Sequence, residues 1–424
     1  MDKFHIVGPS RLAGRVRASG AKNAALPALA ASLLTDEPLV LHRVPRVRDL
    51  RTMARLLDHL GVANEEKDGA LVFQRTRPNK ETADDAPYDL VKTMRASVLV
   101  LGPLLGRYGR ARVSLPGGCA IGVRPIDQHL KGLEALGADI HLSHGYVETV
   151  ARQLTGARFR FDMATVTGTE NVLMAACLAK GTSVLENCAL EPEVTDLANL
   201  LNAMGARISG LGTATLVVDG VSALGGAEHT IIPDRIEGGT YLIGAAMTRG
   251  DVLLEQAVPA DLAPLLDKLA DAGATVEVTA EGVRVRVDGE LTSRDVETCP
   301  HPGFPTDLQA QYMALMTQAR GVASIRETIF ENRFQHAPEL ARMGADVRVD
   351  GASAHVHGPT PLAGAGVMAT DLRASACLVL AGVAAEGETV VDRIYHLERG
   401  YEGMELKLQS LGARVARWST TPAA

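Results

Sequence analysis

Polar side chains stand at the starts of several segments that are otherwise apolar. They are Lys22 and Asn23, Arg95, Asp307, and Asp371 with Arg373. If these segments are helices, their first turns expose unpaired N–H groups and carry about half a positive charge. Several such ends brought together would bind an anion. The pattern therefore predicts a site for a phosphate or carboxylate group.

Helix capping is the competing interpretation for the acidic members of this group. Asp, Asn and Thr are preferred N-caps, so capping alone would account for Asp307 in FPTDLQAQ and Asp371 in ATDLRAS. It does not account for Lys22, Arg95 and Arg373, because a cation at a helix N-terminus opposes the helix dipole. The cations favour a binding site.

A glycine-rich segment around a cysteine offers a second kind of chemistry. In SLPGGCAIGVRP, residues 114–125, three glycines surround Cys119, and Arg124 follows five residues later. A thiol beside a guanidinium can be exposed and have a lowered pKa. The alternative is a plain glycine turn with an incidental cysteine. Cys177 and Cys377 stand in apolar helical segments, which predicts buried positions.

A repeat of about 70 residues organises the elements that must position these side chains. Six helix-like runs each end in glycine and are followed by an alternating run. Their glycines are Gly61, Gly137, Gly205, Gly273, Gly344 and Gly412, at intervals of 76, 68, 68, 71 and 68 residues. The third copy reads as strand FRFDM, helix NVLMAACLAKG, strand TSVLENC, helix EVTDLANLLNAMG and a hairpin. Each copy is therefore predicted to be a βαβαββ unit, which makes the protein an α/β fold.

The two helices of each copy differ in pattern. The first is apolar all round, which is typical of a buried helix, and the second is amphipathic and ends at a glycine C-cap. Three copies per domain would bury three apolar helices inside a shell of sheets. The leading FHIVGPSRLAGRVR has no repeat of its own, and we expect it to complete the last copy. The predicted domains are residues 22–230 and residues 1–21 plus 231–424.

Composition limits the class of protein. Of 424 residues, 46% are hydrophobic and 22% charged, which excludes a disordered chain. Uncharged stretches reach about a dozen residues, too short to span a membrane, and MDKFHIVG shows no signal peptide. Five cysteines, an odd number, favour a reducing compartment. The net charge of −7 argues against a general nucleic-acid or membrane surface. We expect a cytoplasmic protein.

Cofactor motifs are missing from the sequence. It has no P-loop and no dinucleotide fingerprint, so nothing implies ATP or NAD. The HVH at 355–357 has no visible third ligand, so no metal site is predicted.

Seven motifs in fixed order carry a resemblance that covers essentially the whole chain. They are SGAKNAALP, TMRAS, LPGGCAIGVRPID, PHPGFPTDLQAQ, ETIFENRF, ATDLRAS and VDRIYHLERGYE. In these the sequence resembles the UDP-N-acetylglucosamine 1-carboxyvinyltransferases, enolpyruvyltransferases that start bacterial peptidoglycan synthesis. The resemblance implies two inside-out α/β barrels of three repeats each, phosphoenolpyruvate and UDP-N-acetylglucosamine as substrates, no cofactor, and a monomer. The sister branch, the 5-enolpyruvylshikimate-3-phosphate synthases, shares the fold but lacks the cysteine loop.

The resemblance also implies roles for single residues. Cys119 would be the acid that protonates phosphoenolpyruvate, and Asp307 the base for the 3-hydroxyl of the sugar. Lys22, Arg124, Arg373 and Arg399 would hold phosphoenolpyruvate, with Asn23 and Asp371 orienting the intermediate. The contacts to the sugar nucleotide would be Arg95, Arg124, Pro125, Ile126, Asp127, Gln128, Asp307 and Ile329.

Two departures limit this transfer. Some family members carry Leu where this chain has Gln128, and some carry a lysine in the segment corresponding to MATV, residues 163–166. The contact of that segment with the diphosphate is therefore left out of the predicted site.

Three hypotheses follow from the predicted site. Arg124 and Lys22 should lower the pKa of the Cys119 thiol, so the free enzyme would carry a reactive thiolate. The resemblance implies that fosfomycin alkylates this thiolate. Bound phosphate anions would restore its proton. Because the candidate residues fall in both predicted domains, we also expect the domains to close around the substrates.

Two other functions stay open. One is another enolpyruvyl transfer, such as that of the shikimate branch, against which PGGC and RPID argue. The other is a repeat scaffold without catalysis. Scaffolds carry their variable polar residues on an exposed face, whereas here such residues recur at the starts of apolar helices.

Overall fold

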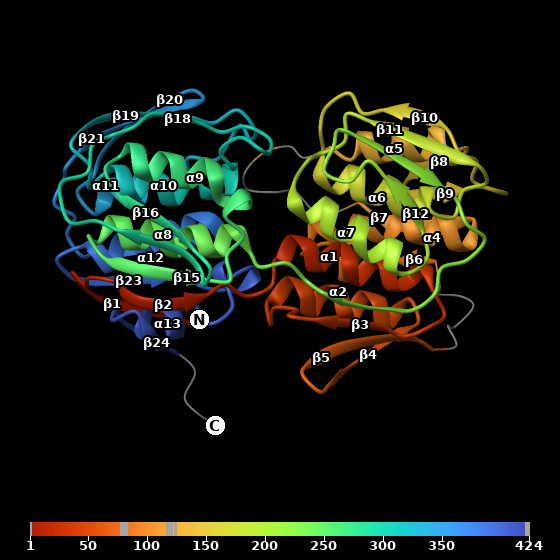
Figure 1. The fold of residues 1–424 in the computed structure, drawn as a ribbon, viewed down its shortest axis with the longest axis horizontal. Helices are drawn as coiled ribbons and strands as arrows, with labels where there is room; N and C mark the ends of the chain where they lie inside the picture. The colour runs from red at the N-terminus through yellow and green to blue at the C-terminus, as the bar shows by residue number, and fades with distance from the viewer. Residues whose placement is uncertain (1, 77–83, 116–121, 123–124, 420–424) are drawn as a thin grey trace. The chain divides into compact units, whose positions relative to one another are not determined.

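The computed structural model describes residues 2–76, 84–115, 122 and 125–419 (Figure 1). The chain divides into two compact units. Of the described residues, unit 1 comprises 2–19, 122 and 233–419, and unit 2 comprises 20–76, 84–115 and 125–232. Among the described residues, no helix combines the length and apolar character that crossing a bilayer would need.

Each unit contains three four-stranded sheets. In every sheet the first two strands of the order are parallel and the remaining neighbours are antiparallel. The sheets of unit 2 are β14(Ala227–Thr230)-β3(Leu39–His42)-β5(Ala70–Arg75)-β4(Val62–Lys67), β6(Asp85–Ala86)-β7(Arg110–Ser114)-β9(Tyr146–Val150)-β8(Asp139–Ser143), and β10(Arg158–Arg160)-β11(Thr182–Glu186)-β13(Thr215–Asp219)-β12(Arg207–Ser209). Those of unit 1 are β2(Ala13–Arg17)-β15(Asp251–Glu255)-β17(Gly282–Arg286)-β16(Thr275–Thr279), β18(Val296–Glu297)-β19(Gly321–Arg326)-β21(Ser353–Gly358)-β20(Asp346–Asp350), and β22(Gly366–Met368)-β23(Gly387–Asp392)-β1(Lys3–Gly8)-β24(Arg414–Trp418). Six sheets of one pattern confirm the predicted α/β class.

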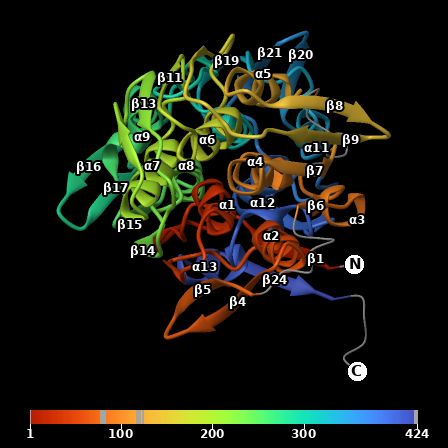
Figure 2. The same ribbon diagram turned by 90° about the vertical axis from the view of Figure 1, so that its right-hand side faces the viewer.

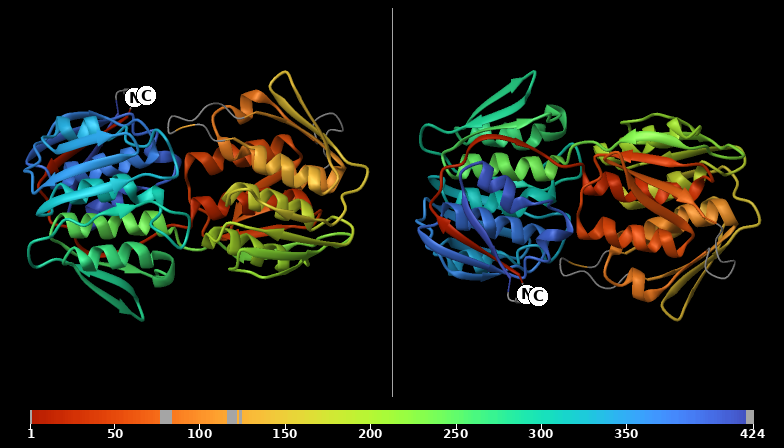
Figure 3. Two further views of the ribbon diagram at one scale, coloured as in Figure 1. Left: turned by 90° about the horizontal axis from the view of Figure 1, so that it is seen from above. Right: turned by 90° about the horizontal axis from the view of Figure 1, so that it is seen from below.

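The apolar helices form the interior of each unit, and we call them the inner helices. Those of unit 2 are α1(Lys22–Ala31) with η1(Ser32–Leu34), η2(Arg95–Val100) with α4(Leu101–Tyr108), and α6(Val166–Ala176). Those of unit 1 are α8(Arg235–Met247), η3(Thr306–Leu308) with α10(Gln309–Met316), and α12(Leu372–Ala384). Every residue from 24 to 31 of α1 and from 236 to 247 of α8 is buried. Figure 2 shows α1, α4 and α6 side by side, and in Figure 3 the strands lie outside the helices of each unit. The expected buried helices inside a shell of sheets are confirmed.

The second helix of each repeat packs one face against the unit. These outer helices are α2(Arg48–His59), α5(Asp127–Ala135), α7(Pro192–Ala203), α9(Pro259–Asp271), α11(Ala337–Arg342) and α13(Met404–Ser410). All six repeat glycines follow them with φ between 87° and 105°. Only glycine adopts this left-handed conformation without strain. The period seen in the sequence is therefore the spacing of helix C-termini.

Strands from distant parts of the chain complete two sheets of unit 1. β1 lies between β23 and β24, where Phe4 faces Val391 on one side and Arg417 on the other. β2 does not join this sheet but pairs in parallel with β15. The leading segment thus supplies strands to the sixth and the fourth copies, rather than to the last copy alone. The first copy, in unit 2, receives its missing parallel strand from β14.

Candidate active site

Two acidic side chains at the inner-helix starts of unit 1 are N-caps. Asp371 Oδ1 accepts the backbone N–H groups of Arg373, at 2.8 Å, and Ala374, at 3.1 Å. Asp234 caps α8 in the same way. The capping interpretation of Asp371 thus describes its contacts with α12. At η3, in contrast, no side chain caps the helix.

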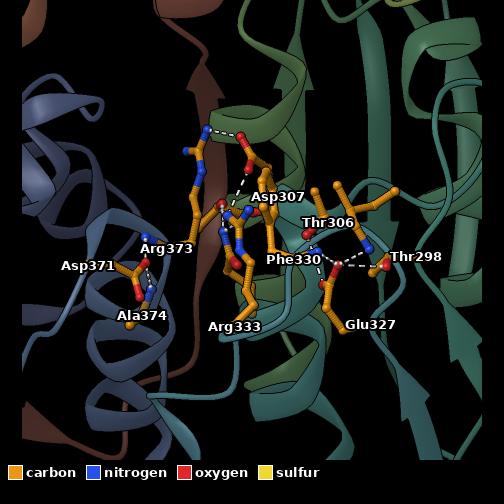
Figure 4. A network of polar contacts seen from close by, with 12 residues as sticks. Thr298, Thr306, Asp307, Glu327, Phe330, Arg333, Asp371, Arg373 and Ala374 are labelled. Carbon is orange, nitrogen blue, oxygen red and sulfur yellow. Dashed lines mark hydrogen bonds and ion pairs between the residues drawn. The ribbon is translucent and has the colours of Figure 1, made fainter. Parts of the chain in front are cut away.

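Asp307, within η3, makes ion pairs instead of a cap (Figure 4). Its Oδ1 accepts a hydrogen bond from Nη2 of Arg333 at 2.7 Å, and its Oδ2 accepts one from Nη2 of Arg373 at 2.6 Å. The two arginine side chains are 5% exposed and that of Asp307 is 26% exposed. Two charge-assisted bonds on one carboxylate favour its ionised form. The structure thus joins two predicted residues, Asp307 and Arg373, to one that was not predicted, Arg333.

Arg373 keeps its charge although it is buried. Burial alone would lower its pKa, but Asp307 and Tyr401 outweigh that effect and leave the pKa above its usual range. The guanidinium carbon lies 5.6 Å from the centre of the Tyr401 ring. A cation held this way at the start of α12 suits an anionic ligand.

Polar contacts fix the backbone around Asp307. Gln311 Nε2 donates to the carbonyl oxygen of Asp307 at 3.1 Å and to the Tyr401 hydroxyl at 3.0 Å. The Tyr401 hydroxyl also lies 2.8 Å from Thr240 Oγ1. Burial raises the pKa of Tyr401. These bonds tie η3 to α8 and to the segment after η4(Leu397–Arg399), in which the predicted Arg399 lies.

Glu327 organises the loop that carries Ile329 and Arg333 (Figure 4). Its Oε1 accepts the backbone N–H groups of Ile329, at 2.9 Å, and Phe330, at 3.1 Å. Its Oε2 accepts a hydrogen bond, 2.8 Å long, from the hydroxyl of Thr306, the residue directly before Asp307. One buried carboxylate therefore sets the position of two predicted residues, Ile329 and Asp307, relative to each other.

His336 lies beside this network at the start of α11. It is 1% exposed, and its Nε2 has no hydrogen-bond partner among the described residues. Burial lowers its pKa to about 4, with Asp371 opposing and Arg333 reinforcing the shift. The ring is therefore neutral at pH 7 and adds no third cation next to Arg333.

In unit 2, Lys22 opens α1 and faces a carboxylate. Its Nζ lies 3.7 Å from Oδ2 of Asp49, in the first turn of α2, and the two side chains are 13% and 8% exposed. Asn23 follows on the same turn and is half-buried. Lys22 thus lies at the start of an inner helix, as the sequence suggested. The distance between its Nζ and the Asp49 carboxylate is longer than that of a hydrogen bond.

Arg95 and the segment before α5 are joined directly. Arg95, the first residue of η2, donates from Nη2 to the carbonyl oxygen of Pro125 at 3.1 Å. Ile126 is buried, and Asp127 opens α5. Four of the residues predicted for the sugar nucleotide therefore lie together in unit 2.

Gln128 anchors α5 to the segment that precedes residues 163–166. Its Nε2 donates to Oδ2 of Asp127 and of Asp162, each at 2.9 Å, and its Oε1 accepts the Asp162 N–H at 2.9 Å. Lys131 also donates to Asp162, which lowers the pKa of that exposed carboxyl. A leucine at position 128 could make none of these bonds, so this departure from the family carries its own local structure.

A neutral network supports the broken helix that begins with Arg95. Asn171 accepts the Gly102 N–H at 2.5 Å and donates to the Val98 carbonyl at 2.9 Å. Its Nδ2 also lies 2.9 Å from Nδ1 of His129. The change from η2 to α4 interrupts the regular helical bonds, and the Asn171 amide satisfies two of the groups that this leaves.

Some predicted residues lie outside the described part of the chain. These are Cys119 and Arg124, in the glycine-rich segment. Of the other cysteines, Cys177, directly after α6, and Cys377, in α12, are buried as predicted, and burial raises the pKa of Cys177 to about 12. Neither position suits a reactive thiol.

A hollow of unit 2 lies away from these residues. It has a volume of about 800 Å³ and opens at the carboxyl ends of the inner helices of unit 2, where Leu34, Arg107 and Lys180 contribute to its wall. Lys22, Asn23 and Arg95 stand at the opposite, amino ends of inner helices of the same unit. None of the predicted residues that the structure describes lines it.

Comparisons with known proteins cover nearly the whole chain. Residues 6–408 match the family model described as EPSP synthase (3-phosphoshikimate 1-carboxyvinyltransferase). Among solved structures, the enolpyruvyl transferase NikO from Streptomyces tendae is 27% identical and superposes with a TM-score of 0.88 over 99% of both chains. An EPSP synthase from Acinetobacter baumannii is 18% identical, with a TM-score of 0.75 over 99% of this chain and 100% of that one.

Curated relatives are more similar in sequence. A protein from Myxococcus xanthus (strain DK1622) is 56% identical over 98% of this chain and 99% of its own length. One from Solibacter usitatus (strain Ellin6076) is 58% identical over 98% of this chain and 100% of its own length. Both relatives are named UDP-N-acetylglucosamine 1-carboxyvinyltransferase.

Proposed function

This chain belongs to the EPSP synthase family, and from that premise we propose that it is a UDP-N-acetylglucosamine 1-carboxyvinyltransferase. It transfers the enolpyruvyl group of phosphoenolpyruvate to the 3-hydroxyl of UDP-N-acetylglucosamine and releases phosphate. This is the first committed step of peptidoglycan synthesis. The observation that carries the proposal is 56–58% identity to relatives of that name over nearly their full length.

The shikimate reaction is disfavoured by the same comparison. The EPSP synthases among the solved structures are 18% identical to this chain, a level that shows the shared fold and not the substrate. The PGGC and RPID motifs of this sequence also argue against that branch. The two reactions use the same enolpyruvyl donor, so only the acceptor separates them.

The reaction needs an acid and a base. Cys119 gives a proton to the methylene carbon of phosphoenolpyruvate, and Asp307 takes the proton of the sugar hydroxyl as its oxygen bonds to the adjacent carbon. Phosphate then leaves, and loss of a proton from the new methyl group restores the double bond. The ionised Asp307 at an inner-helix start, with its fixed backbone, supports the role of base.

Binding of phosphoenolpyruvate is assigned to Lys22, Asn23, Arg124, Asp371, Arg373 and Arg399. A phosphate and a carboxylate call for several cations, and a planar guanidinium fits a carboxylate with two bonds. The sugar nucleotide is assigned to Arg95, the segment 124–128, Asp307 and Ile329. Residues 1–21 with 231–424 and residues 22–230 are proposed as the two domains that close around both substrates.

A phosphate-release assay tests the reaction. The full chain with phosphoenolpyruvate and UDP-N-acetylglucosamine should release phosphate, whereas shikimate 3-phosphate as acceptor should give none. Cys119→Ala and Asp307→Asn should each abolish turnover. Release with shikimate 3-phosphate alone would overturn the proposal, and normal turnover of Cys119→Ala would overturn the acid assignment.

Alkylation by fosfomycin tests the reactive thiol. Labelling of Cys119 at pH 7 should exceed that of an ordinary thiol of pKa about 8.5, and Cys119→Asp should escape labelling while staying active. Identical labelling curves with and without sugar nucleotide would contradict a thiol that bound anions reprotonate. A monomer acting in the cytoplasm, where both charged substrates are made, completes the proposal.

A further inference from the structure

The two oxygens of Asp307 have different guanidinium partners. Oδ1 is bonded by Arg333, from the loop before α11, and Oδ2 by Arg373, from the start of α12. On the basis of the proposed function, we propose that Arg333 is a positioning residue that holds Asp307, while Arg373 is an exchangeable partner that phosphoenolpyruvate withdraws. Withdrawal frees Oδ2 to accept the proton of the sugar hydroxyl.

Arg333 has the features of a fixed partner. It is 4% exposed, and its guanidinium carbon lies 5.1 Å from the centre of the Phe330 ring. The Phe330 backbone is itself held by Glu327. Nε and Nη1 of Arg333 are buried without a hydrogen-bond partner among the described residues. If the ion pair with Asp307 broke, Arg333 would be a buried charge with no hydrogen-bond acceptor among the described residues. Breaking a buried pair in this way is strongly unfavourable.

Arg373 has the features of an exchangeable partner. Its backbone N–H is already capped by Asp371, and its side chain stands at the positive end of α12, where an anion is favoured. Tyr401 and Asp234 also act on its charge, so it does not depend on Asp307 alone. An anion with two charged groups competes well here, because the Asp307 carboxylate is shared with Arg333.

The exchange couples the base to the donor substrate. With both arginines bonded, Asp307 is a weak base; with Arg373 withdrawn, it faces one cation fewer and its basicity rises. Among the described residues, the charged groups on the neighbouring elements include Arg333, Arg373, Asp371, Asp234 and Glu327, while His336 stays neutral near pH 7. The sugar hydroxyl is therefore deprotonated only when the group that it attacks is present.

A double-mutant cycle on anion binding tests the exchange. The probe is phospholactate, the saturated analogue of phosphoenolpyruvate, titrated calorimetrically into the full chain. Asp307→Asn should tighten binding about tenfold, because Arg373 is no longer shared. Arg333→Met should weaken it several-fold, because Asp307 then binds Arg373 alone. In the Asp307→Asn background, Arg333→Met should have no effect.

The double mutant decides between exchange and simple charge loss. If Arg333 acts on the anion directly, its effect persists in the Asp307→Asn background, and the exchange is wrong. Circular dichroism of each variant shows whether it is folded. If Arg333→Met does not fold, Arg333→Gln, which also removes the charge, takes its place in the cycle, and the same outcomes apply to it.

Kinetics test the positioning role. Arg333→Met should lower kcat about 100-fold, the loss expected for a misplaced catalytic group, with a smaller change in KM for UDP-N-acetylglucosamine. Arg333→Lys should recover part of kcat. Arg326→Met, which removes an exposed arginine of β19, is the control and should be unchanged. A normal kcat for Arg333→Met overturns the role, whereas a wild-type chain that releases no phosphate overturns the proposed function instead.

Discussion

Each unit buries one glutamate in an inner helix, and the two units treat its charge in opposite ways. In unit 1, Glu237 of α8 is bonded by Lys407 and accepts the Ser19 N–H at 2.7 Å. In unit 2, Glu170 of α6 has an Oε1 without a hydrogen-bond partner among the described residues, and its charged neighbours are Glu193 and Glu191. Burial raises the pKa of both carboxyls, but only at Glu237 does a lysine oppose the shift.

The wider networks follow the same division. Unit 1 balances buried charge with buried charge, as at Asp307, whereas the inner helices of unit 2 are joined by neutral bonds from Asn171. If an anion binds Arg373 as proposed, it must displace the Asp307 carboxylate. Unit 2 offers Lys22, whose pair with Asp49 is longer, at 3.7 Å. The two units thus differ in the ion pairs that an anionic ligand would have to break: a hydrogen-bonded pair at Arg373 and a longer pair at Lys22.

Removing the cation from Glu237 should give the largest loss of stability. Lys407→Met leaves a buried carboxylate without its countercharge, which typically lowers the free energy of unfolding by about 3–5 kcal/mol. The loss should shrink at low pH, because protonation of Glu237 removes the charge. Urea unfolding at pH 7 and pH 5 measures both. Lys3→Met, which removes a surface pair with Asp392, should change stability by less than about 1 kcal/mol. Equal effects of the two variants would contradict the division.

Removing the Asn171 side chain, which centres the network of unit 2, should cause a somewhat smaller loss of stability. Asn171→Ala leaves the buried N–H of Gly102 and the C=O of Val98 unpaired, at about 1–3 kcal/mol for such groups, and the loss should not depend on pH between 6 and 8. Asn202→Ala is the matched control, since Asn202 also bonds two backbone groups but is half-buried, so water replaces it. A pH-dependent loss for Asn171→Ala would show that the network carries charge.

The architecture could be predicted because local physics repeats it. A glycine is needed wherever an outer helix ends in a left-handed residue, so Gly61 and its five counterparts mark the repeat. Helices that are buried on every side are mostly apolar on every side. The sheets that β2 and β14 join were harder to predict. Both strands are short, and nothing in their sequences indicates that β2 pairs with β15 or that β14 pairs with β3.

The site was predicted only in part, because side-chain partners depend on distant residues. Asp307 and Asp371 both occur in the tripeptide TDL, yet one forms two ion pairs and the other caps a helix. Arg333, in the quoted motif ETIFENRF, gave no sign of its pair with Asp307, which lies 26 positions earlier. Glu327, in the same motif, resembles a solvated loop residue until its four accepted bonds are seen. These partners are set by tertiary packing.

The last predicted effect concerns Glu170 and has the opposite sign to the others. Its pKa in the folded protein is raised by burial and by Glu193 and Glu191. Below the unfolded value of about 4.3 the acid is protonated in both states, so it imposes no penalty. As the pH rises above that value, the unfolded chain releases the proton first, and stability falls by up to about 1.4 kcal/mol per pH unit until the folded pKa is passed.

Glu170→Gln should therefore stabilise unit 2. The neutral amide removes the titration, so the variant should match the wild type near pH 4 and exceed it at pH 8, by a margin that grows by up to about 1.4 kcal/mol per pH unit until the folded pKa is passed. Glu65→Gln, on an exposed edge strand of the same unit, is the control and should leave the pH profile unchanged. Urea unfolding across this range measures the difference. A Glu170→Gln variant that is destabilised at pH 8 would mean that its carboxylate is charged and paired, as Glu237 is in unit 1.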